Sequence, residues 1–266
     1  MANGAEKTIK VIIGTPINCE HAYVLDKFLD NQRQIQHAYP GCELVLATSE
    51  KDYAPKLNDM LDAVKLTGKV LAHGLIRPDY ARHWVWDVTC GREAIRQYAV
   101  SQAEADYLLF LDADMLFAPD VVAAMVKHID GYDALFNGYA LREYGVGLAG
   151  AGCLMLNRRI FKRIRFRCCE FRSGEVIFED NLLEMDLFCL HARVRRGFYV
   201  ATDHYQDACS IKHTEPQPVG KTREMVNRPL IRYVLIKSSM MLHYNIPWRL
   251  KIALDRLNRG NKGRGK

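Results

Sequence analysis

Short apolar runs alternate with helix-like segments through the first half of this 266-residue chain. Each run is rich in aliphatic and aromatic residues and is bounded by turn residues, a pattern typical of strands buried on both faces. The segments between them carry apolar residues at the spacing of an amphipathic helix. Strands are expected at 10–16, 42–48, 69–75 and 107–111, and helices at 22–35, 57–64 and 90–105. This alternation predicts a mostly parallel sheet with helices on both faces.

The second half of the chain no longer alternates strictly. A Gly-rich loop separates two strand-like runs, 133–140 and 151–156, which indicates an antiparallel or mixed part of the sheet. A long helix is expected over 181–196, closed by Gly197 at its C-cap position. Further expected elements are a helix at 120–129 and strands at 198–202 and 208–213. The sequence thus predicts one α/β domain over residues 1–215.

The strand expected at 107–111 ends in two carboxylates, Asp112 and Asp114, which flank a single alanine. In an extended chain residues two apart face the same side, so both carboxylates can face one point. Open α/β sheets bind their ligands at the carboxyl ends of strands. Carboxylate oxygens suit Mg²⁺ or Mn²⁺, and such a cation can hold a diphosphate. The alternative is a polar turn that only ends the strand, since Asp is common in turns.

The positive charge of the chain is concentrated at its C-terminus. Residues 221–266 hold 12 Lys and Arg and two acids, a net of +10, so the other residues carry 6 − 10 = −4. Pro216 and Pro218 mark a break, and 216–266 is expected to be a basic amphipathic helical tail whose end is disordered. Such tails commonly bind an anionic membrane surface or nucleic acid. Of these two partners, nucleic acid is the less favoured one here.

The composition excludes several classes of protein. A hydrophobic fraction of 49% and a charged fraction of 26% are those of an ordinary globular domain. No run approaches the length of about 18 apolar residues that a spanning helix needs, and the N-terminus lacks the apolar core of a signal peptide. The eight Cys form no C-x-x-C pair, so reduced thiols are expected. We expect a cytoplasmic protein. Because of its basic tail, peripheral binding to a membrane stays open as an alternative.

A literal G-x-G-x-x-G, the dinucleotide-binding fingerprint, lies within residues 144–150. That motif should follow the first strand and open a helix, whereas here it precedes the strand-like run 151–156. The glycines are therefore expected to let the backbone approach a ligand or a neighbouring element closely.

Four acids gather near the start of the long helix: Glu179, Asp180, Glu184 and Asp186. Acids in a first turn interact favourably with the helix dipole, and Asp180 can act as an N-cap, which explains one or two of them structurally. A carboxylate held near a hydroxyl can also serve as a general base. Asp180 and Asp186 lie roughly 120° apart around a helix axis, so they are not expected to face the same point.

One histidine closes the last expected strand of the body. His213 is more often a structural residue in such a place, but beside two Asp residues it becomes a candidate third metal ligand, with His204 the less favoured alternative. Trp84 and Trp86 lie among basic and aromatic residues and could form a stacking face for a sugar or a base, or could equally be half-buried core.

The order of strand, Asp-x-Asp, Gly-rich segment, acidic helix start and late histidine resembles the glycosyltransferases of the GT-A fold, most closely family 2. Residues 91–99 followed by 105–114 resemble that family's approach to its metal site, and residues 185–200 resemble its segment ending in Gly-aromatic-x-Val. The likeness covers roughly residues 9–213. It implies a Rossmann-like mixed sheet flanked by helices.

The resemblance also implies a function for residues 1–215, as a catalytic domain that transfers a sugar from a nucleoside diphosphate sugar to an acceptor hydroxyl. Inversion is the favoured course, and retention, which needs no base at the acidic helix start, stays open. Contacts to the nucleotide are implied for Thr15, Pro16, Glu50, Arg92 and Asp112. Asp112 and Asp114 would hold Mn²⁺ or Mg²⁺ against the diphosphate, and His213 would complete the shell. The acceptor (a glycan, a lipid-linked molecule or a protein) is not specified.

Two acids are candidates for the base that deprotonates the acceptor. The ungapped match places the family's catalytic Asp at Asp186, although Met185 stands where the family has Glu. Glu179 and Asp180 supply a literal Glu-Asp six residues earlier, so either Asp can be the base.

Two other functions fit the sequence less well. A sugar-phosphate nucleotidyltransferase of related fold usually carries basic residues in the loop after its first strand, and Gly14–Cys19 has none. A non-catalytic binder of glycans or nucleic acid is disfavoured because both Asp residues of the Asp-x-Asp are intact.

Overall fold

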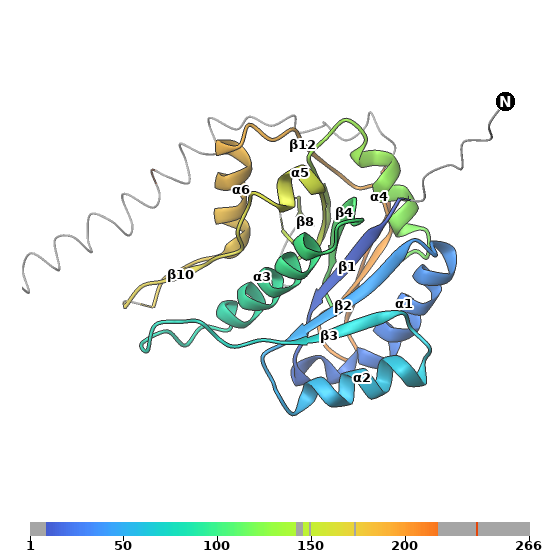
Figure 1. Ribbon diagram of the computed structural model, residues 1–266, viewed down its shortest axis with the longest axis horizontal. Coiled ribbons are helices and arrows are strands. Elements are labelled where there is room, and N and C mark those ends of the chain that lie inside the picture. The colour runs from blue at the N-terminus through green and yellow to red at the C-terminus, as the bar shows by residue number, and fades with distance from the viewer. Residues whose placement is uncertain (1–8, 142–145, 149, 173, 218–237, 239–266) are drawn as a thin grey trace, which may run out of the picture.

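A seven-stranded sheet forms the centre of the protein, which a computed structural model describes for residues 9–141, 146–148, 150–172, 174–217 and 238 (Figure 1). In spatial order its strands are β12 (Val194–Gly197), β6 (Ala134–Asn137), β9 (Cys153–Asn157), β4 (Tyr107–Leu111), β1 (Val11–Pro16), β2 (Cys42–Thr48) and β3 (Gly68–Ala72). β4, β1, β2 and β3 run parallel, as do β12 and β6. β9 is antiparallel to both of its neighbours. The mixed sheet predicted from the sequence is therefore confirmed.

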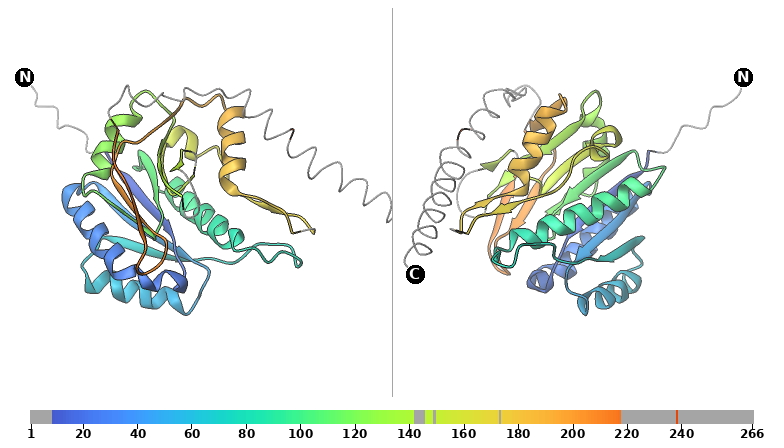
Figure 2. Two further views of the ribbon diagram at one scale, coloured as in Figure 1. Left: turned by 180° about the vertical axis from the view of Figure 1, so that it is seen from behind. Right: turned by 60° about the vertical axis from the view of Figure 1, so that its left-hand side comes forward.

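Helices cover both faces of this sheet (Figure 2). They are α1 (Leu25–Ala38), α2 (Tyr53–Ala63), α3 (Val85–Ser101), α4 (Val121–Ile129), α5 (Arg158–Phe161) and α6 (Glu179–Cys189), with a 3₁₀ turn, η1, at Cys19–Tyr23. Alternate strand residues enter opposite cores, since successive side chains point to opposite faces. Ile13 and Leu109 pack with α1, α2 and α4, whereas Ile12 and Phe110 pack with α3, α5 and α6.

The small antiparallel elements lie around the carboxyl ends of the central strands. A three-stranded sheet joins β5 (Met115–Phe117), β13 (Thr202–Tyr205) and β14 (Ile211–Thr214) in the order β14-β13-β5. Two hairpins pair β7 (Tyr139–Ala140) with β8 (Val146–Gly147), and β10 (Cys169–Glu170) with β11 (Val176–Ile177). The β10–β11 hairpin and the loop between β3 and α3 project side by side from the body (Figure 1).

The last long helix is shorter than its sequence pattern predicts. α6 ends at Cys189 rather than continuing to residue 196, because His191 adopts a left-handed φ of 51° that a helix cannot continue through. The segment expected as its last turn is instead β12, an edge strand parallel to β6. Val194 and Arg196, two residues apart on this strand, are both buried, and the tertiary pairing overrides the local helical pattern. The following strand begins at Thr202, four residues later than expected.

The predicted tail, residues 216–266, lies outside the described residues except for Pro216, Gln217 and Ser238. Its helical character and the domain boundary before it therefore stay predictions. Within the part of the chain that the structure describes, no helix has both the length and the apolar character needed to cross a bilayer.

Candidate active site

A cavity of about 470 Å³ opens at the carboxyl ends of β1 and β4, between the first turns of α3 and α6. Among its lining residues are Pro16, Arg92, Asp112, Asp114 and Asp180, all predicted from the sequence, and His204. The Asp-x-Asp pair therefore lies where open α/β sheets bind their ligands.

Main-chain contacts hold Asp112 at the end of β4. The Thr15 hydroxyl, fully buried in β1, donates a hydrogen bond of 2.7 Å to the carbonyl of Leu111. The backbone N–H of Asp112 donates to the carbonyl of Gly152 at 3.0 Å. Thr15 does not line the cavity, so its contribution in this structure is to fix the strand end rather than to present a group to a ligand.

Arg92 of α3 is a buried cation between two carboxylates. Its Nη2 lies 2.6 Å from Asp112 Oδ1, and its Nη1 pairs with Glu179 Oε1. Burial disfavours the charge of Arg92, and the attraction of Asp112 and Glu179 outweighs it, so its pKa is raised. Burial likewise raises the pKa of Glu179, and Arg92 opposes this shift. Through these two ion pairs, Arg92 connects Asp112 of the Asp-x-Asp to Glu179, the first residue of α6.

Two glycines near Asp112 allow close packing: Gly150, within the segment whose glycines were predicted to do so, and Gly152, which lies just beyond it. A Cβ at Gly152 would lie 2.7 Å from Asp112 Oδ2 and 2.8 Å from the Tyr139 hydroxyl. A Cβ at Gly150 would collide with the same hydroxyl. Tyr139 is buried, which together with the charge of Asp112 raises its pKa, so the phenol stays neutral.

His204 lies next to Asp114 because of strand register. β13 pairs with β5 so that His204 opposes Met115, the residue after Asp114. Its Nε2 lies 3.4 Å from Asp114 Oδ2, and its Nδ1 lies 2.6 Å from the carbonyl of Ala140. A carbonyl only accepts, so Nδ1 carries a proton, and the lone pair of a neutral imidazole is then on Nε2. Two acceptors at this distance repel each other unless a positive charge, a proton or a metal cation, lies between them.

His213, the histidine predicted to complete the metal shell, lies on the opposite face of the small sheet. It pairs with Asp203, and residues 203 and 204 of one strand point to opposite sides. Its ring nitrogens lie 2.5 Å from Asp203 Oδ1 and 2.8 Å from Glu215 Oε1. Both carboxylates raise its pKa and favour the imidazolium, which cannot ligate a metal. The structure thus places His204, and not His213, beside the Asp-x-Asp.

The groups around Asp114 suit a hard divalent cation that is shared with a ligand. No set of three or more His, Cys, Asp and Glu side chains within the described residues converges closely enough to hold a metal by itself. Mg²⁺ and Mn²⁺ are commonly held by one or two carboxylates together with substrate phosphates. The carboxylates of Asp112 and Asp114 and the imidazole of His204, oriented through its second nitrogen, are donors of the type such an ion accepts, and phosphate oxygens of a ligand would have to complete the shell.

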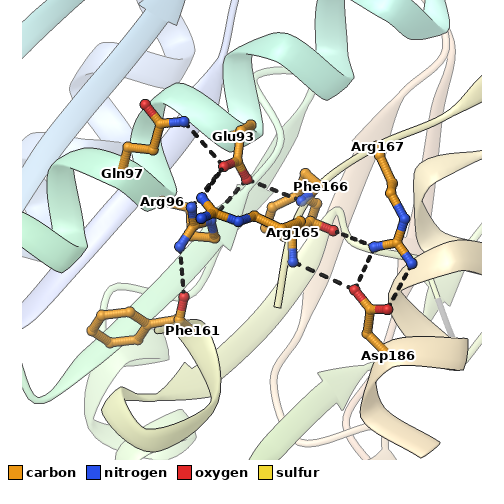
Figure 3. Close-up of polar contacts among 8 residues, drawn as sticks. All are labelled: Glu93, Arg96, Gln97, Phe161, Arg165, Phe166, Arg167 and Asp186. Atoms are coloured by element: carbon orange, nitrogen blue, oxygen red, sulfur yellow. Dashed lines mark hydrogen bonds and ion pairs between the residues drawn. The ribbon is translucent and has the colours of Figure 1, made fainter. Parts of the chain in front are cut away.

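The two acids considered as a base lie in different environments. Asp180, in the first turn of α6, lines the cavity. Asp186, two turns later, points away from it into an ion pair, with Arg167 nitrogens at 2.5 and 2.7 Å from its two oxygens (Figure 3). The backbone N–H of Arg165 also donates to it at 3.4 Å. Of the two carboxylates, the structure brings only Asp180 to the Asp-x-Asp.

Of the two remaining residues predicted to contact the nucleotide, one lines the cavity and the other does not. Pro16, at the end of β1, lines the cavity. Glu50 does not: its carboxylate accepts from the backbone N–H of Cys19 at 2.8 Å and from the thiol of the same residue at 3.1 Å. Glu50 therefore holds the loop after β1 in place.

Comparison with known proteins agrees with this arrangement. Residues 89–170, which include the Asp-x-Asp, match the family described as Glycosyl transferase family 2. The fold is similar to that of the mannosyltransferase PcManGT from Pyrobaculum calidifontis in complex with GDP-Man and Mn2+, with a TM-score of 0.53 at 13% identity over 97% of this chain and 76% of that one. The chain therefore has the GT-A fold, and its residues 89–170 are similar to family 2 glycosyltransferases.

A second solved structure also has this fold. S. aureus TarS 1-349 aligns with a TM-score of 0.51 at 14% identity, over 94% of this chain and 77% of that chain. Alignments with two further TarS structures span 57% and 34% of those chains. No curated protein matches the sequence. At these identities the structures establish the fold, and the GT-A architecture predicted from the sequence is confirmed.

From the sequence, His204 was only the less favoured metal ligand, Tyr139 was missed, and Glu179 was assigned a different role. His204 and Tyr139 depend on the pairing of strands that are distant in the sequence, which no local pattern reports. Glu179 was read as a helix-dipole acid, whereas it is the buried partner of Arg92. In the sequence, Glu179 directly follows an aromatic residue at a helix start. This pattern occurs for buried and for solvent-exposed acids alike, so it does not predict that Glu179 is buried.

Proposed function

We propose that the protein is a metal-dependent glycosyltransferase that uses a nucleoside diphosphate sugar as donor. The observation that carries the proposal is the charge of the cavity. Its described lining holds six carboxylates and a single Lys or Arg side chain, Arg92, which already pairs with two of them. A diphosphate cannot enter such a cavity without a further cation to offset the repulsion. The lining carboxylates are Glu20, Asp87, Asp112, Asp114, Glu179 and Asp180.

In this proposal Asp112, Asp114 and His204 hold Mn²⁺ or Mg²⁺. When bound, the ion neutralises the charge that develops on the leaving diphosphate. Arg92 fixes Asp112 in position, and Pro16 forms the wall on the nucleotide side. PcManGT is described in complex with GDP-Man and Mn2+, which supports a cation and a donor of this class.

Asp180 is the proposed general base of an inverting transfer. It removes the proton from the acceptor hydroxyl as the oxygen forms a bond to the anomeric carbon of the donor. The bond from that carbon to the diphosphate oxygen breaks, and its electron pair leaves with the nucleoside diphosphate. The pairing of both Asp186 oxygens with Arg167 favours Asp180 over Asp186 for this role.

A donor panel tests the proposal. The full-length protein is incubated with UDP-, GDP- and ADP-sugars and Mn²⁺, and free nucleoside diphosphate is measured. Slow hydrolysis of one donor that stops on addition of EDTA is expected. Release of pyrophosphate from a nucleoside triphosphate and a sugar phosphate would instead identify a nucleotidyltransferase, and turnover unaffected by EDTA would contradict metal dependence.

The histidine assignment gives a first prediction. His204→Ala should raise the Mn²⁺ concentration needed for half-maximal donor hydrolysis by more than the roughly 10–100-fold that loss of an outer-shell partner costs. His213→Ala, the matched control on the neighbouring strand, should leave that concentration unchanged. A Mn²⁺ titration of both variants measures the difference, and the reverse order of sensitivity would restore His213 as the ligand.

The base assignment gives a second prediction. Asp180→Asn should lower the rate of donor hydrolysis by roughly 10²–10⁴-fold, the usual contribution of a general base, while the Kd of the nucleoside diphosphate stays the same. Asp186→Asn breaks a partly exposed ion pair with Arg167 and should leave the rate within about twofold. Single-turnover kinetics with water as acceptor separate the two variants. A larger loss in Asp186→Asn would reverse the assignment.

We also propose that the basic tail attaches the protein peripherally to an anionic membrane. Its net charge of +10 over residues 221–266 supports this, since each Lys or Arg near an anionic surface contributes about 1 kcal/mol. A chain truncated after Gly220 should lose co-sedimentation with phosphatidylserine vesicles and keep donor hydrolysis. Unchanged sedimentation would refute the proposal, and tight, salt-sensitive binding of DNA would point to nucleic acid instead.

A further inference from the structure

An exposed aromatic side chain lies at the mouth of the cavity. Trp84 directly precedes α3, is 62% exposed, and lines the cavity together with Phe178. The two ring centroids are 6.0 Å apart, and the ring of His83 lies 5.1 Å from Trp84 and 5.6 Å from Phe178. Large aromatic side chains that stay open to solvent beside a cavity are typical of ligand-binding surfaces.

The loop that carries Trp84 is held by a single buried carboxylate. Glu170 of β10 accepts the backbone N–H of Arg82 on both of its oxygens at 3.0 Å, and the N–H of His83 at 3.0 Å. Its Oε2 also accepts from Trp86 Nε1 at 3.0 Å. These bonds fix the backbone on both sides of Trp84. The exposed ring is therefore presented from a fixed segment, which lowers the entropy lost when a ligand stacks on it.

Trp84 and Phe178 lie on the side of the cavity that holds the proposed base. Phe178 is the N-cap residue of α6, two residues before Asp180. The proposed nucleotide wall, at Pro16, is formed by the end of β1. An acceptor that stacks on Trp84 thus lies beside Phe178, two residues before Asp180, in a cavity that Asp112 and Asp114 also line.

The negative charge of the cavity lining favours some classes of acceptor over others. Apart from Arg92, which is engaged with Asp112 and Glu179, the described lining holds no Lys or Arg. An acceptor that bears phosphate would add negative charge to a described lining that already holds six carboxylates and one guanidinium. A neutral molecule with hydroxyl groups and a flat C–H face would stack on the indole and donate hydrogen bonds to carboxylates, and a pyranose ring has both features.

We infer that Trp84 and Phe178 form the acceptor platform and that the acceptor is a carbohydrate, whose pyranose ring stacks on Trp84 with one hydroxyl directed to Asp180. This inference rests on the proposed function and assigns its acceptor class. It predicts that a change at Trp84 affects the acceptor far more than the donor.

The test uses the full-length protein with Mn²⁺, the donor that it hydrolyses, and a panel of cello-, chito-, manno- and maltotriose. One of these saccharides should accelerate release of the nucleoside diphosphate. Trp84→Ala should then raise the KM for that saccharide by about 10- to 30-fold, with a change of less than about threefold in the KM for the donor. Trp84→Phe should restore most of the loss. Ile76→Ala, an 84% exposed apolar residue of the same loop outside the cavity lining, is the matched control and should match the wild type.

Two results would overturn the inference while leaving the proposed function intact. Equal increases in both KM values in Trp84→Ala would assign Trp84 to the donor. Normal donor hydrolysis without acceleration by any saccharide of the panel would contradict a carbohydrate acceptor. If no donor is hydrolysed, the proposed function fails, and the platform is tested separately by acrylamide quenching of tryptophan fluorescence. Protection by a saccharide in the wild type but not in Trp84→Phe would support the platform, and equal quenching in all samples would refute it.

Discussion

Asp114→Asn is expected to abolish donor turnover, with a loss of roughly 10³-fold or more in kcat/KM. Asp114 is only 7% exposed, and its carboxylate faces His204 at the end of the strand that opens the cavity. Loss of a ligand to the cation removes several kcal/mol of transition-state charge stabilisation, and about 1.4 kcal/mol corresponds to a tenfold change in rate. Nucleoside diphosphate release over a range of Mn²⁺ concentrations measures the effect.

The other end of the same strand supplies the control for this prediction. Asp106 lies just before β4, where its Oδ2 accepts from the backbone N–H of Lys10 at 3.0 Å. Asp106→Asn makes the same chemical change without touching the cavity, so it should keep wild-type turnover. If Asp114→Asn retains more than about a tenth of the wild-type rate at saturating Mn²⁺, the carboxylate is not part of the site.

Arg92→Met is expected to lower the free energy of unfolding by about 3 kcal/mol, because it leaves the buried carboxylate of Glu179 and the partly buried one of Asp112 without their counter-charge. Asp112 and Glu179 would then repel each other across the space that the guanidinium fills. For a chain of this size the loss corresponds to a fall in Tm of roughly 10 °C. Denaturant unfolding of the purified variant gives the value directly.

The destabilisation should also depend on pH. The folded-state pKa of Glu179 is raised by burial, and Arg92 opposes that shift, so the variant raises it further. An acid with a raised pKa costs little stability below its unfolded pKa, and the cost appears as the pH rises through the folded pKa. The deficit of Arg92→Met should therefore be smaller at pH 5 than at pH 8. A deficit that is independent of pH would indicate lost packing instead of unpaired charge.

Arg96→Met distinguishes the stability effect from the effect on the site. Arg96 is one turn further along α3, is equally buried, and pairs with Glu93 and with the carbonyl of Phe161 (Figure 3). Its replacement should also lower stability, but the KM for the donor should remain unchanged. Arg92→Met should raise that KM as well, because Asp112 loses the contact that orients it.

Features that depend on local sequence were predictable. The apolar run 107–111 identified the central strand, because a strand buried on both faces consists of apolar residues. The two acids that follow it identified the edge of the sheet where the cavity opens, because ligands bind at the carboxyl ends of strands. The glycines of residues 144–150 were likewise predicted to permit a close approach to a neighbouring element, and Gly150 does so at Tyr139.

Features that depend on pairing between distant segments were not predictable in detail. His204 reaches Asp114 only because β13 pairs with β5 in one register, and a shift by one residue would have presented Asp203 instead. The helix predicted to continue after Cys189 was wrong, because the pairing of β12 with β6 outweighs the local helix propensity of these residues. Asp186 matched the expected position of a base in the sequence, but Arg167, nineteen residues earlier, engages it.

The most direct test of a shared cation and diphosphate site is the binding of Mn²⁺ followed by electron paramagnetic resonance, with and without UDP or GDP. Mn²⁺ alone should bind weakly, since the described residues offer no complete metal shell, and one nucleoside diphosphate should strengthen the binding at least about tenfold. The strengthening should disappear in Asp112→Asn and Asp114→Asn. Mn²⁺ binding that neither nucleotide changes, or that both variants retain, would contradict the account.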